Sequence, residues 1–350
     1  MANLLITGGA GFIGGNFVHY WSPRHPADRL VVLDALTYAG NASTIAGVEQ
    51  AELVVGDIRD TGLVERLLRD HAIQTIVHFA AETHVDRSIA GPDAFIETNV
   101  VGTHSLLKAA RAVWLDEGSG SPHRFHHIST DEVYGSLGAN DPPFGENSPL
   151  APNSPYAASK AASDHLVRAY HRTYGLEVTT SRCSNNFGPF QYPEKLVPLT
   201  LLCALQGREI PIYGDGLNRR DWLHVEDHCR GIELCLDKGA VGESYNLGGG
   251  TELPNVEIVE AICAHIDRMF YERPELAERY PACPAAHGGK TGRLVTFVED
   301  RPGHDRRYSV DDNKARRELG YSPRREFMQS LPETIDWYLA NEKWWRVPTT

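Results

Sequence analysis

Residues 4–15 read LLITGGAGFIGG, and this stretch decides the fold. A short apolar run, typical of a buried strand, leads directly into three glycines, Gly8, Gly11 and Gly14. Glycines at this spacing permit a tight turn and let the backbone approach a pyrophosphate, and the N-terminus of the following helix favours negative charge. The stretch therefore predicts a strand, a phosphate-binding turn and a helix. The alternative for a glycine-rich stretch is a purely structural turn.

An acidic residue supports the phosphate-binding interpretation. Asp34 ends the next apolar run, LVVLD (30–34), twenty residues after Gly14. An acid at this distance is placed to accept hydrogen bonds from a ribose 2′-hydroxyl, and it would repel the 2′-phosphate of NADP. The next residue is Ala35, not an arginine that could hold such a phosphate. The predicted cofactor is NAD.

Strand-like runs alternate with helical stretches over the first 180 residues or so, which favours βαβ units. The strands are expected at 3–7, 30–34, 52–56, 75–80, 124–129 and 177–182. The predicted fold is α/β, with a doubly wound parallel Rossmann sheet in residues 1–182 that binds NAD. Proline and glycine become more frequent afterwards, so residues 183–350 are expected to form mainly a smaller mixed α/β substrate-binding domain, with some segments returning to the first domain.

Composition narrows the classes of partner. The 350 residues are 41% hydrophobic and 23% charged, which is typical of a globular protein with a buried core. A formal charge of −12 argues against a nucleic-acid partner. No apolar run reaches the roughly 18 residues of a membrane span, and MANLLITGG has neither the basic region nor the cleavage site of a secretion signal. The six cysteines contain no CxxC pair and are expected to be free thiols in the cytoplasm, and the sixteen histidines lack metal-ligand spacing, so no metal is expected.

Two further motifs contain residues capable of proton transfer. Tyr156 and Lys160 stand four residues apart, and hence on one face of a helix. A nearby ammonium, together with a positive nicotinamide, would lower the pKa of the tyrosine. The alternative is a core tyrosine beside a solvated lysine. In STDEVYG (129–135), Asp131 and Glu132 are adjacent, so they repel each other if both are charged in a confined site. The alternative is a solvated loop.

Taken together, the motifs resemble those of the extended short-chain dehydrogenase/reductases and, within them, the dTDP-glucose 4,6-dehydratases. The motifs are TGGAGFIG (7–14), DALTYAGN (34–41), HFAAETHVDRSI (78–89), STDEVYG (129–135), YAASK (156–160), RCSNNFGP (182–189), RDWLHVEDH (220–228) and DRPGHDRR (300–307). The resemblance implies a homodimeric NAD-dependent lyase that converts dTDP-glucose to dTDP-4-keto-6-deoxyglucose and water. This reaction is the first step toward deoxysugars such as rhamnose or the sugars of secondary metabolites.

The resemblance also implies catalytic roles. Thr130 would hydrogen-bond the sugar near its 4-hydroxyl, and Tyr156, with Lys160, would take the proton of that hydroxyl. Asp131 would protonate the leaving hydroxyl on carbon 6, and Glu132 would remove the proton on carbon 5. Neighbouring carboxyls in a closed site do not easily both ionise, which suits a division into an acid and a base.

Binding residues follow from the same motifs. The expected cofactor contacts are Gly8, Gly11, Phe12, Ile13, Gly14, Asp34, Ala35, Leu36, Thr37, Asp57, Ile58, Phe79, Ala80, Ala81, Thr83, Thr98, Tyr156, Lys160 and Asn186. The expected substrate contacts are Thr83, Thr130, Asn185, Lys195, Leu196, Pro211, Ile212, Tyr213, Arg220, Asn255, Asp300, Arg301, Pro302, Gly303 and His304. Arg220 is expected at the diphosphate. Alternatives remain for three residues: Asp57 as a helix N-cap, Arg220 in a surface ion pair, and His304 in a turn.

Two rival functions share part of this pattern. A nucleotide-sugar 4-epimerase would share the NAD loop, Tyr156 and Lys160 but would not use an acid–base pair. A catalytically silent NAD-binding sensor would not need the catalytic set at all. The expected dimer contact is a pair of helices near 99–114 and 156–174, which have apolar residues on more than one face.

Overall fold

A seven-stranded parallel sheet forms the centre of the computed structural model, which describes residues 2–118 and 122–346. The strand order is β10-β6-β5-β4-β1-β2-β3, and each neighbouring pair is parallel. The strands are β1 (Asn3–Thr7), β2 (Arg29–Asp34), β3 (Ala51–Val55), β4 (Thr75–His78), β5 (Arg124–Thr130), β6 (Val178–Cys183) and β10 (Ser244–Leu247). The predicted α/β fold with a doubly wound parallel sheet is confirmed.

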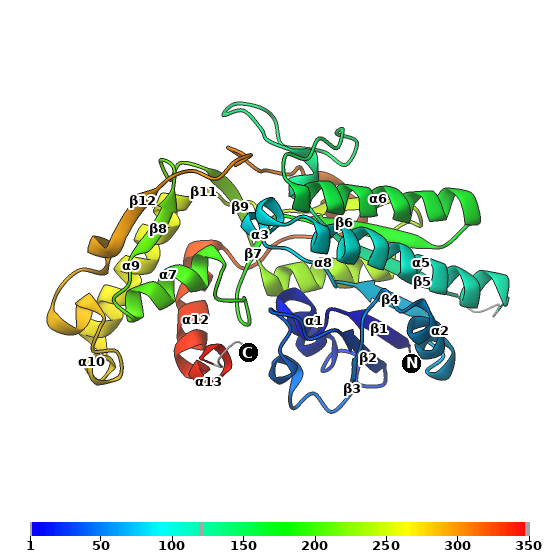
Figure 1. Cartoon of the computed structure of the whole chain (residues 1–350), viewed down its shortest axis with the longest axis horizontal. Coiled ribbons are helices and arrows are strands. Elements are labelled where there is room, and N and C mark those ends of the chain that lie inside the picture. The colour runs from blue at the N-terminus through cyan, green and yellow to red at the C-terminus, as the bar shows by residue number, and fades with distance from the viewer. Residues whose placement is uncertain (1, 119–121, 347–350) are drawn as a thin grey trace.

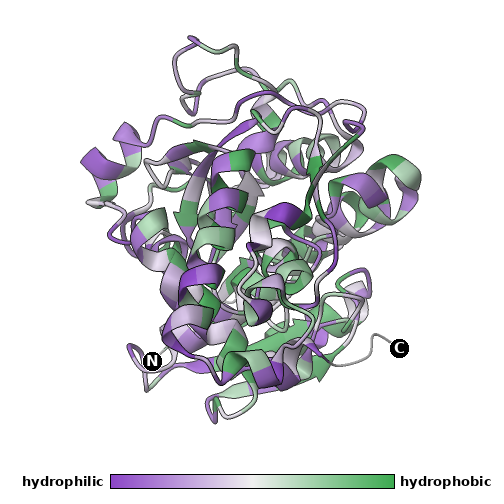
Figure 2. Cartoon of the chain, turned by 90° about the vertical axis from the view of Figure 1, so that its left-hand side faces the viewer, coloured by the Kyte–Doolittle hydropathy of each residue, from purple (hydrophilic) through white to green (hydrophobic). Residues whose placement is uncertain are grey.

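Helices cover both faces of this sheet (Figure 1). Alternate residues of a strand point to opposite faces, so Leu5 packs in the core under one helix layer while Leu4 and Ile6 pack under the other. The first layer contains α2 (Thr61–Asp70), α5 (Thr103–Arg111) and α6 (Pro155–Tyr174), and the second contains α1 (Phe12–Trp21) and α8 (Val225–Lys238). Burial on both faces explains the continuous apolar runs of the sequence. In Figure 2 the hydrophobic colour gathers on interior elements.

Element boundaries differ slightly from those predicted. β4 ends at His78, so Phe79 and Ala80 leave the strand for the loop beyond the sheet. The helix predicted near 99–114 is longer: it begins with α4 (Asp93–Phe95), includes π-helical stretches η2 (Ile96–Gly102) and η3 (Ala112–Asp116), and contains α5 between them. The remaining short helices before β5 are η1 (Ala42–Ile45) and α3 (Val85–Ala90).

The start of α6 has the chemistry that a helix N-terminus needs. The Ser154 hydroxyl accepts a hydrogen bond from the backbone N–H of Ala157, and Pro155 occupies the first turn. At the other end Gly175 takes a left-handed conformation with φ of 76°, which ends the helix. These caps fix the position of Tyr156 at the first turn of α6, over the sheet.

The C-terminal half has its own apolar core, at the left of Figure 1. The helices around this core are α7 (Leu196–Leu205), α9 (Asn255–Glu272), α10 (Leu276–Arg279), α12 (Phe327–Ala340) and α13 (Glu342–Trp345), with 3₁₀ turns η5 (Pro284–His287) and η6 (Thr291–Leu294), while α11 (Asn313–Leu319) packs against α8 and β10. Its small sheets pair β7 (Asn185–Phe187), β9 (Arg219–His224) and β11 (Glu252–Pro254), and β8 (Ile210–Tyr213) with β12 (Val295–Val298).

The division into two domains at residues 182 and 183 stays a proposal. The proposed boundary falls at the end of β6, which lies between β5 and the edge strand β10. The later segments α8 and β10 pack against the first half of the chain, on α1 and β6 respectively.

Three further observations concern the described residues. All six cysteines are buried and free. Within residues 2–118 and 122–346, no helix combines the length and apolar character of a membrane span. The same residues contain no group of three or more His, Cys, Asp or Glu side chains arranged to hold a metal ion.

Candidate active site

The glycine turn closes tightly against the sheet. Gly8 has φ of 71°, and a Cβ there would lie 2.6 Å from the backbone nitrogen of Ala80. A Cβ at Gly14 would lie 2.4 Å from the Gly8 carbonyl oxygen, so a side chain would push helix α1 away from the turn. Gly11 is the N-cap of α1 and offers no side chain to the first N–H groups of the helix. Those groups therefore face the turn as an anion-binding terminus.

Asp34 lies at the carboxyl end of β2, next to the glycine turn that follows β1. One carboxylate oxygen accepts a hydrogen bond from the backbone N–H of Ala10 at 2.9 Å, and the other accepts one from Leu36 at 2.8 Å. Burial raises the pKa of Asp34, while these two backbone donors favour its ionised form. The carboxylate is thereby held rigidly, with lone pairs remaining for a ribose hydroxyl.

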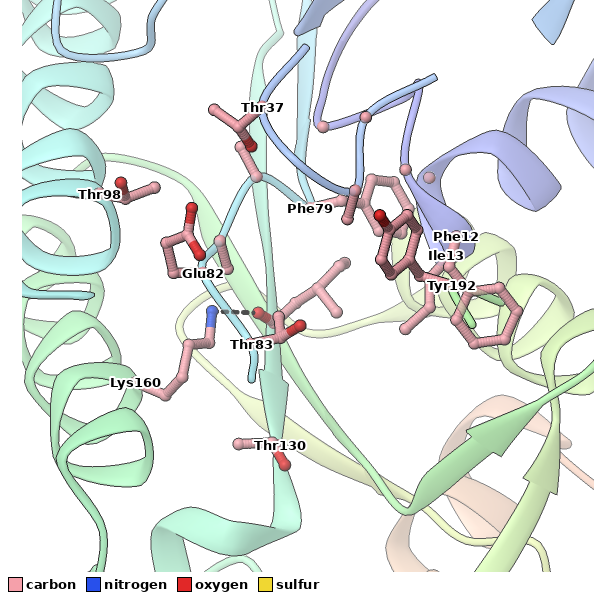
Figure 3. A pocket seen from close by; sticks show the side chains of 18 of the residues that line it. Phe12, Ile13, Thr37, Phe79, Glu82, Thr83, Thr98, Thr130, Lys160 and Tyr192 are labelled. Atoms are coloured by element: carbon pink, nitrogen blue, oxygen red, sulfur yellow. Dashed lines mark hydrogen bonds between the residues drawn. The ribbon is translucent and has the colours of Figure 1, made fainter. Parts of the chain in front are cut away.

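A single cavity of about 350 Å³ joins the predicted cofactor residues to the catalytic ones. All of the predicted cofactor residues line it except Leu36. Leu36 instead has φ of 50°, and its backbone nitrogen donates to Asp34. Figure 3 shows side chains from separate segments, including Phe12, Phe79, Thr98, Thr130 and Lys160, around this cavity.

Asp57 lines the cavity and is not the helix N-cap that the sequence allowed as an alternative. Arg59 donates two hydrogen bonds to one oxygen of Asp57, at 3.0 and 2.7 Å, and holds the pKa of this acid below its usual value. The N-cap of α2 is Asp60, whose side chain accepts a hydrogen bond from Leu63. Asp57 is therefore oriented at the cavity edge by its neighbour.

Thr130 ends β5, and Asp131 and Glu132 begin the 3₁₀ turn η4 (Asp131–Tyr134) directly after it. The Thr130 hydroxyl donates to Asp131 at 3.3 Å and accepts from the backbone N–H of Glu132 at 3.3 Å. All three residues line the cavity, and Asp131 is only 2% exposed. The alternative of a solvated loop is wrong.

The two carboxyls differ in their electrostatic surroundings. Burial raises the pKa of Asp131 well above its usual value, and the charges of Glu132 and Asp221 add to this effect. Burial also raises the pKa of Glu132, but three cations oppose the rise, those of Arg301, Arg220 and Lys195. Arg220 also opposes the rise at Asp131, but the charges of Glu132 and Asp221 add to it, so Asp131 is the better placed of the two to keep a proton and Glu132 to ionise, as an acid and a base require.

Tyr156 and Lys160 both line the cavity from helix α6, and both are buried. The Lys160 ammonium donates to the carbonyl of Ile128 at 2.8 Å, and burial lowers its pKa to about 8. The prediction that the pKa of Tyr156 is lowered is wrong for the chain by itself. Burial, followed by the charge of Glu132, raises this pKa well above 10. That the positive nicotinamide of bound NAD lowers the pKa of Tyr156 stays a prediction.

Asp164 is a buried carboxylate that the sequence interpretation missed. It lies one helical turn beyond Lys160, accepts from Arg182 at 2.8 Å, and lies 3.3 Å from the Nε2 atom of His127. Burial opposes its ionisation, but Arg182 and His127 hold its pKa below the usual value. Its charge raises the pKa of Lys160 against the effect of burial. The signal in the sequence was the i, i+4 spacing from Lys160.

The predicted substrate residues form two groups. Thr83, Thr130, Asn185 and Lys195 line the cavity, and the Lys195 ammonium donates to the Thr83 carbonyl at 3.0 Å. The others do not line it: Leu196, Pro211, Ile212, Tyr213, Arg220, Asn255, Asp300, Arg301, Pro302, Gly303 and His304. Arg220 and Arg301 of this second group nevertheless oppose the rise in the pKa of Glu132, so these two lie near the catalytic end of the cavity.

Contacts within the second group hold it together. The Tyr213 hydroxyl donates to Asp86 at 3.0 Å, and Arg301 reaches the same acid at 3.4 Å. His304 lies 2.5 Å from an oxygen of Asp300, consistent with the turn that Gly303 permits at φ of 66°. The roles of these residues toward a substrate stay predictions.

Arg220 is buried, not at the surface. It donates to the carbonyls of Arg219 and Asp305 at 2.8 and 2.9 Å, and its guanidinium lies 4.3 Å from the ring centre of Tyr308. The surface ion pair is therefore not its role. Its charge opposes the rise in the pKa of Glu132. The contact of Arg220 with the diphosphate stays a prediction.

Several residues that line the cavity were not predicted. They include Tyr38, Glu82, Cys183, Ser184, Gln191, Tyr192 and Glu194. Tyr38 lies inside the motif DALTYAGN, while Tyr192 and Glu194 follow RCSNNFGP. The sequence indicates these residues only by their position in or near the motifs. Which of their side chains face the cavity depends on the tertiary fold.

Comparisons with known proteins agree with this geometry. The family model for GDP-mannose 4,6 dehydratase matches residues 5–334. The chain is 53% identical to the dTDP-glucose 4,6-dehydratase of Xanthomonas campestris pv. campestris strain B100, over 98% of this chain and 95% of that protein. The crystal structure of the dTDP-glucose 4,6-dehydratase from Streptomyces venezuelae, with NAD bound, is similar at a TM-score of 0.87 and 48% identity, covering 99% of this chain and 100% of that one.

An epimerase structure is less similar. The UDP-glucose 4-epimerase of Thermus thermophilus, in complex with NAD, has a TM-score of 0.81 but only 27% identity, covering 97% of this chain and 99% of that one. The shared fold explains the high TM-score, and the sequence distance separates the two reactions.

Proposed function

Because this chain belongs to the family of the dTDP-glucose 4,6-dehydratases, we propose that it converts dTDP-glucose to dTDP-4-keto-6-deoxyglucose and water with NAD as its cofactor. The observation that supports this reaction best is the carboxyl pair. Asp131 and Glu132 lie in the same cavity as the glycine turn, Tyr156 and Lys160. An epimerase has no use for such a pair, and a silent sensor would not need the whole set.

The first step is oxidation at carbon 4. NAD, when bound, accepts the hydride of carbon 4 and returns it to carbon 6. Tyr156 takes the proton of the 4-hydroxyl through its phenol oxygen, and the positive nicotinamide of bound NAD, with the Lys160 ammonium, would have to offset the burial and the Glu132 charge that raise its pKa in the chain alone. Thr130 hydrogen-bonds the sugar at the same place. Burial of all three groups excludes water from the reacting carbon.

Elimination follows at carbons 5 and 6. A ketone at carbon 4 acidifies the neighbouring C–H, and Glu132 removes that proton as a carboxylate and gives it back to carbon 5 when the hydride is added at carbon 6. Asp131 keeps its proton until the hydroxyl on carbon 6 leaves as water. The cations of Arg220, Arg301 and Lys195 favour the charged form of Glu132 against the effect of its burial, and burial together with the charge of Glu132 favours the neutral form of Asp131.

The experiment is a turnover assay with the purified chain and added NAD. With dTDP-glucose, the keto sugar should appear as an absorbance that rises in base. With UDP-glucose in parallel, formation of UDP-galactose would indicate the epimerase instead. Bound NAD without turnover of any nucleotide hexose would leave only the sensor, and either of these results would contradict the proposal.

We also propose that the chain forms a homodimer through η2, α5 and α6. Leu106 and Leu107 of the expected interface are buried in the chain's own core. Ile96, Val101 and Tyr174 remain 46%, 42% and 43% exposed on η2 and α6, so they offer apolar surface to a partner copy. Sedimentation at micromolar concentration should give a dimer, and a monomer would contradict it.

A reducing compartment suits the cysteines, and we propose the cytoplasm as the site of action. All six thiols are buried and unpaired with one another. Fractionation of cells that produce the tagged chain should place it with cytoplasmic enzymes, and its recovery outside the cell would contradict this proposal.

A further inference from the structure

Side chains from three separate segments meet at the part of the cavity that the glycine turn and Asp34 line. One segment follows β2, the second is the first turn of α3, and the third follows β7. All but one of these side chains line the cavity. We name them the clasp: Tyr38, Arg87, Tyr192 and Glu194, of which Arg87 alone is not part of the lining.

The centre of the clasp is a hydrogen bond between Tyr38 and Glu194. The Tyr38 hydroxyl donates to Glu194 at 2.9 Å, across 156 positions of sequence. Burial and the charge of Glu194 raise the pKa of Tyr38, so this hydroxyl keeps its proton and remains a donor. The acceptor is a carboxyl group, and hydrogen bonds to charged carboxylates are among the stronger kinds in proteins.

Ring contacts and a second polar contact surround this bond. The Arg87 guanidinium lies 3.9 Å from the centre of the Tyr38 ring, and the Tyr192 ring meets Tyr38 edge-on at 5.5 Å. His84 lies 3.6 Å from the second oxygen of Glu194. The clasp is therefore a connected set and not a single chance contact.

The segment that supplies Tyr192 and Glu194 is itself anchored at both ends. Asn16 of helix α1 donates to the Pro189 carbonyl at 2.8 Å, and Tyr338 of α12 donates to the Gln191 carbonyl. Lys195 donates to the Thr83 carbonyl at 3.0 Å. Figure 3 shows Tyr192 on the same side of the cavity as Phe12 and Ile13 of the glycine turn. This segment thus spans from the substrate half of the chain to the cofactor loop.

We propose that the clasp retains the dinucleotide during turnover and sets its rate of dissociation. The proposal rests on the proposed dehydratase function, because only an internal hydride cycle requires that retention. The hydride that leaves carbon 4 has to reach carbon 6 of the same sugar. Dissociation of the dinucleotide between these steps, when it is NADH, would leave a 4-keto sugar without its hydride and an enzyme without its cofactor.

The test uses the purified holoenzyme and the variant Tyr38→Phe, which removes one hydroxyl and keeps the ring contacts. Ethanol and excess alcohol dehydrogenase convert each NAD that dissociates to NADH, whose absorbance gives the dissociation rate. We expect Tyr38→Phe to release NAD about 10- to 100-fold faster than the wild type, as loss of a hydrogen bond to a charged group implies. Its turnover of dTDP-glucose should decline over successive cycles and recover when NAD is added.

Tyr20→Phe is the matched control. It removes another tyrosine–glutamate hydrogen bond, from Tyr20 to Glu233 at 2.6 Å, at residues that do not line the cavity. This control should release NAD at the wild-type rate. Wild-type release from Tyr38→Phe, or equally fast release from Tyr20→Phe, would overturn the proposal.

Glu194→Ala tests the acceptor independently. Combined with Tyr38→Phe, it should dissociate NAD no faster than Glu194→Ala alone, because both changes break the same bond. An additive acceleration would overturn the clasp. If the wild type does not turn over dTDP-glucose while Tyr38→Phe still releases NAD faster, the proposed function fails and the retention of NAD by the clasp stands.

Discussion

Replacing Asp164 with Asn should move the alkaline limit of activity to lower pH. Lys160 assists Tyr156 only while it is an ammonium, and burial has already lowered its pKa to about 8. Asp164 opposes that lowering, so its neutralisation lets the pKa fall further. The wild-type rate should therefore fall as pH rises through about 8, and the variant's rate should fall earlier.

The size of the shift follows from geometry. Charges about 6 Å apart, as at i and i+4 of a helix, interact by about 3 kcal/mol at an effective dielectric of about 20, or about two pKa units. Arg182 shares the Asp164 carboxylate, at 2.8 Å, so we expect about half of this, roughly one unit. The variant should then retain most of its wild-type rate near pH 6.5 and be roughly eightfold slower than wild type near pH 8.5.

The assay is the rate of enzyme-bound NADH formation in a single turnover of dTDP-glucose, measured across pH. Asp164→Glu keeps the negative charge, so its rate should fall over the same alkaline pH range as the wild-type rate, even if the longer side chain lowers stability. An Asp164→Asn enzyme that loses activity equally at every pH would mean that Asp164 only supports the fold, and the electrostatic reasoning would be wrong.

Four other substitutions test the remaining roles. Asp34→Ala should weaken NAD binding by about 1.5–3 kcal/mol and relax the rejection of NADP, as titration calorimetry with both cofactors can measure; equal affinity of the wild type for the two would refute this role. Glu132→Gln should form bound NADH but almost no 6-deoxy product. Asp131→Asn should slow water loss by about 10²–10⁴-fold while sparing oxidation. Formation of the 6-deoxy product at near wild-type rate by either variant would contradict the role assigned to that residue. Tyr156→Phe should give no NADH signal, and a normal signal would assign the base elsewhere.

Local rules account for what could be predicted from the sequence. The glycine turn, Asp34 and the pair of Tyr156 and Lys160 depend on spacings of a few residues within one strand–turn–helix unit or one helix turn. The parallel sheet follows from the alternation of buried strands and helices. These features need no knowledge of distant contacts.

The missed features depend on tertiary contacts. Tyr38 and Glu194 are separated by 156 positions, and nothing local indicates that they meet. The raised pKa of Tyr156 reflects burial and the nearby Glu132 carboxylate, which only the assembled site creates. The family resemblance placed Leu36 among the cofactor contacts, but this residue does not line the cavity, and its left-handed backbone turns the chain there.

Deuterium placed at carbon 4 of dTDP-glucose tests the central claim most directly. If Tyr156 and Lys160 assist oxidation, Asp131 and Glu132 assist elimination, and the hydride stays inside the cavity, then the deuterium should reappear at carbon 6 of the same product molecule. Mass spectrometry of the product formed from a mixture of labelled and unlabelled substrate distinguishes transfer within one molecule from exchange between molecules. Deuterium lost to solvent, or scrambled onto unlabelled molecules, would contradict the account.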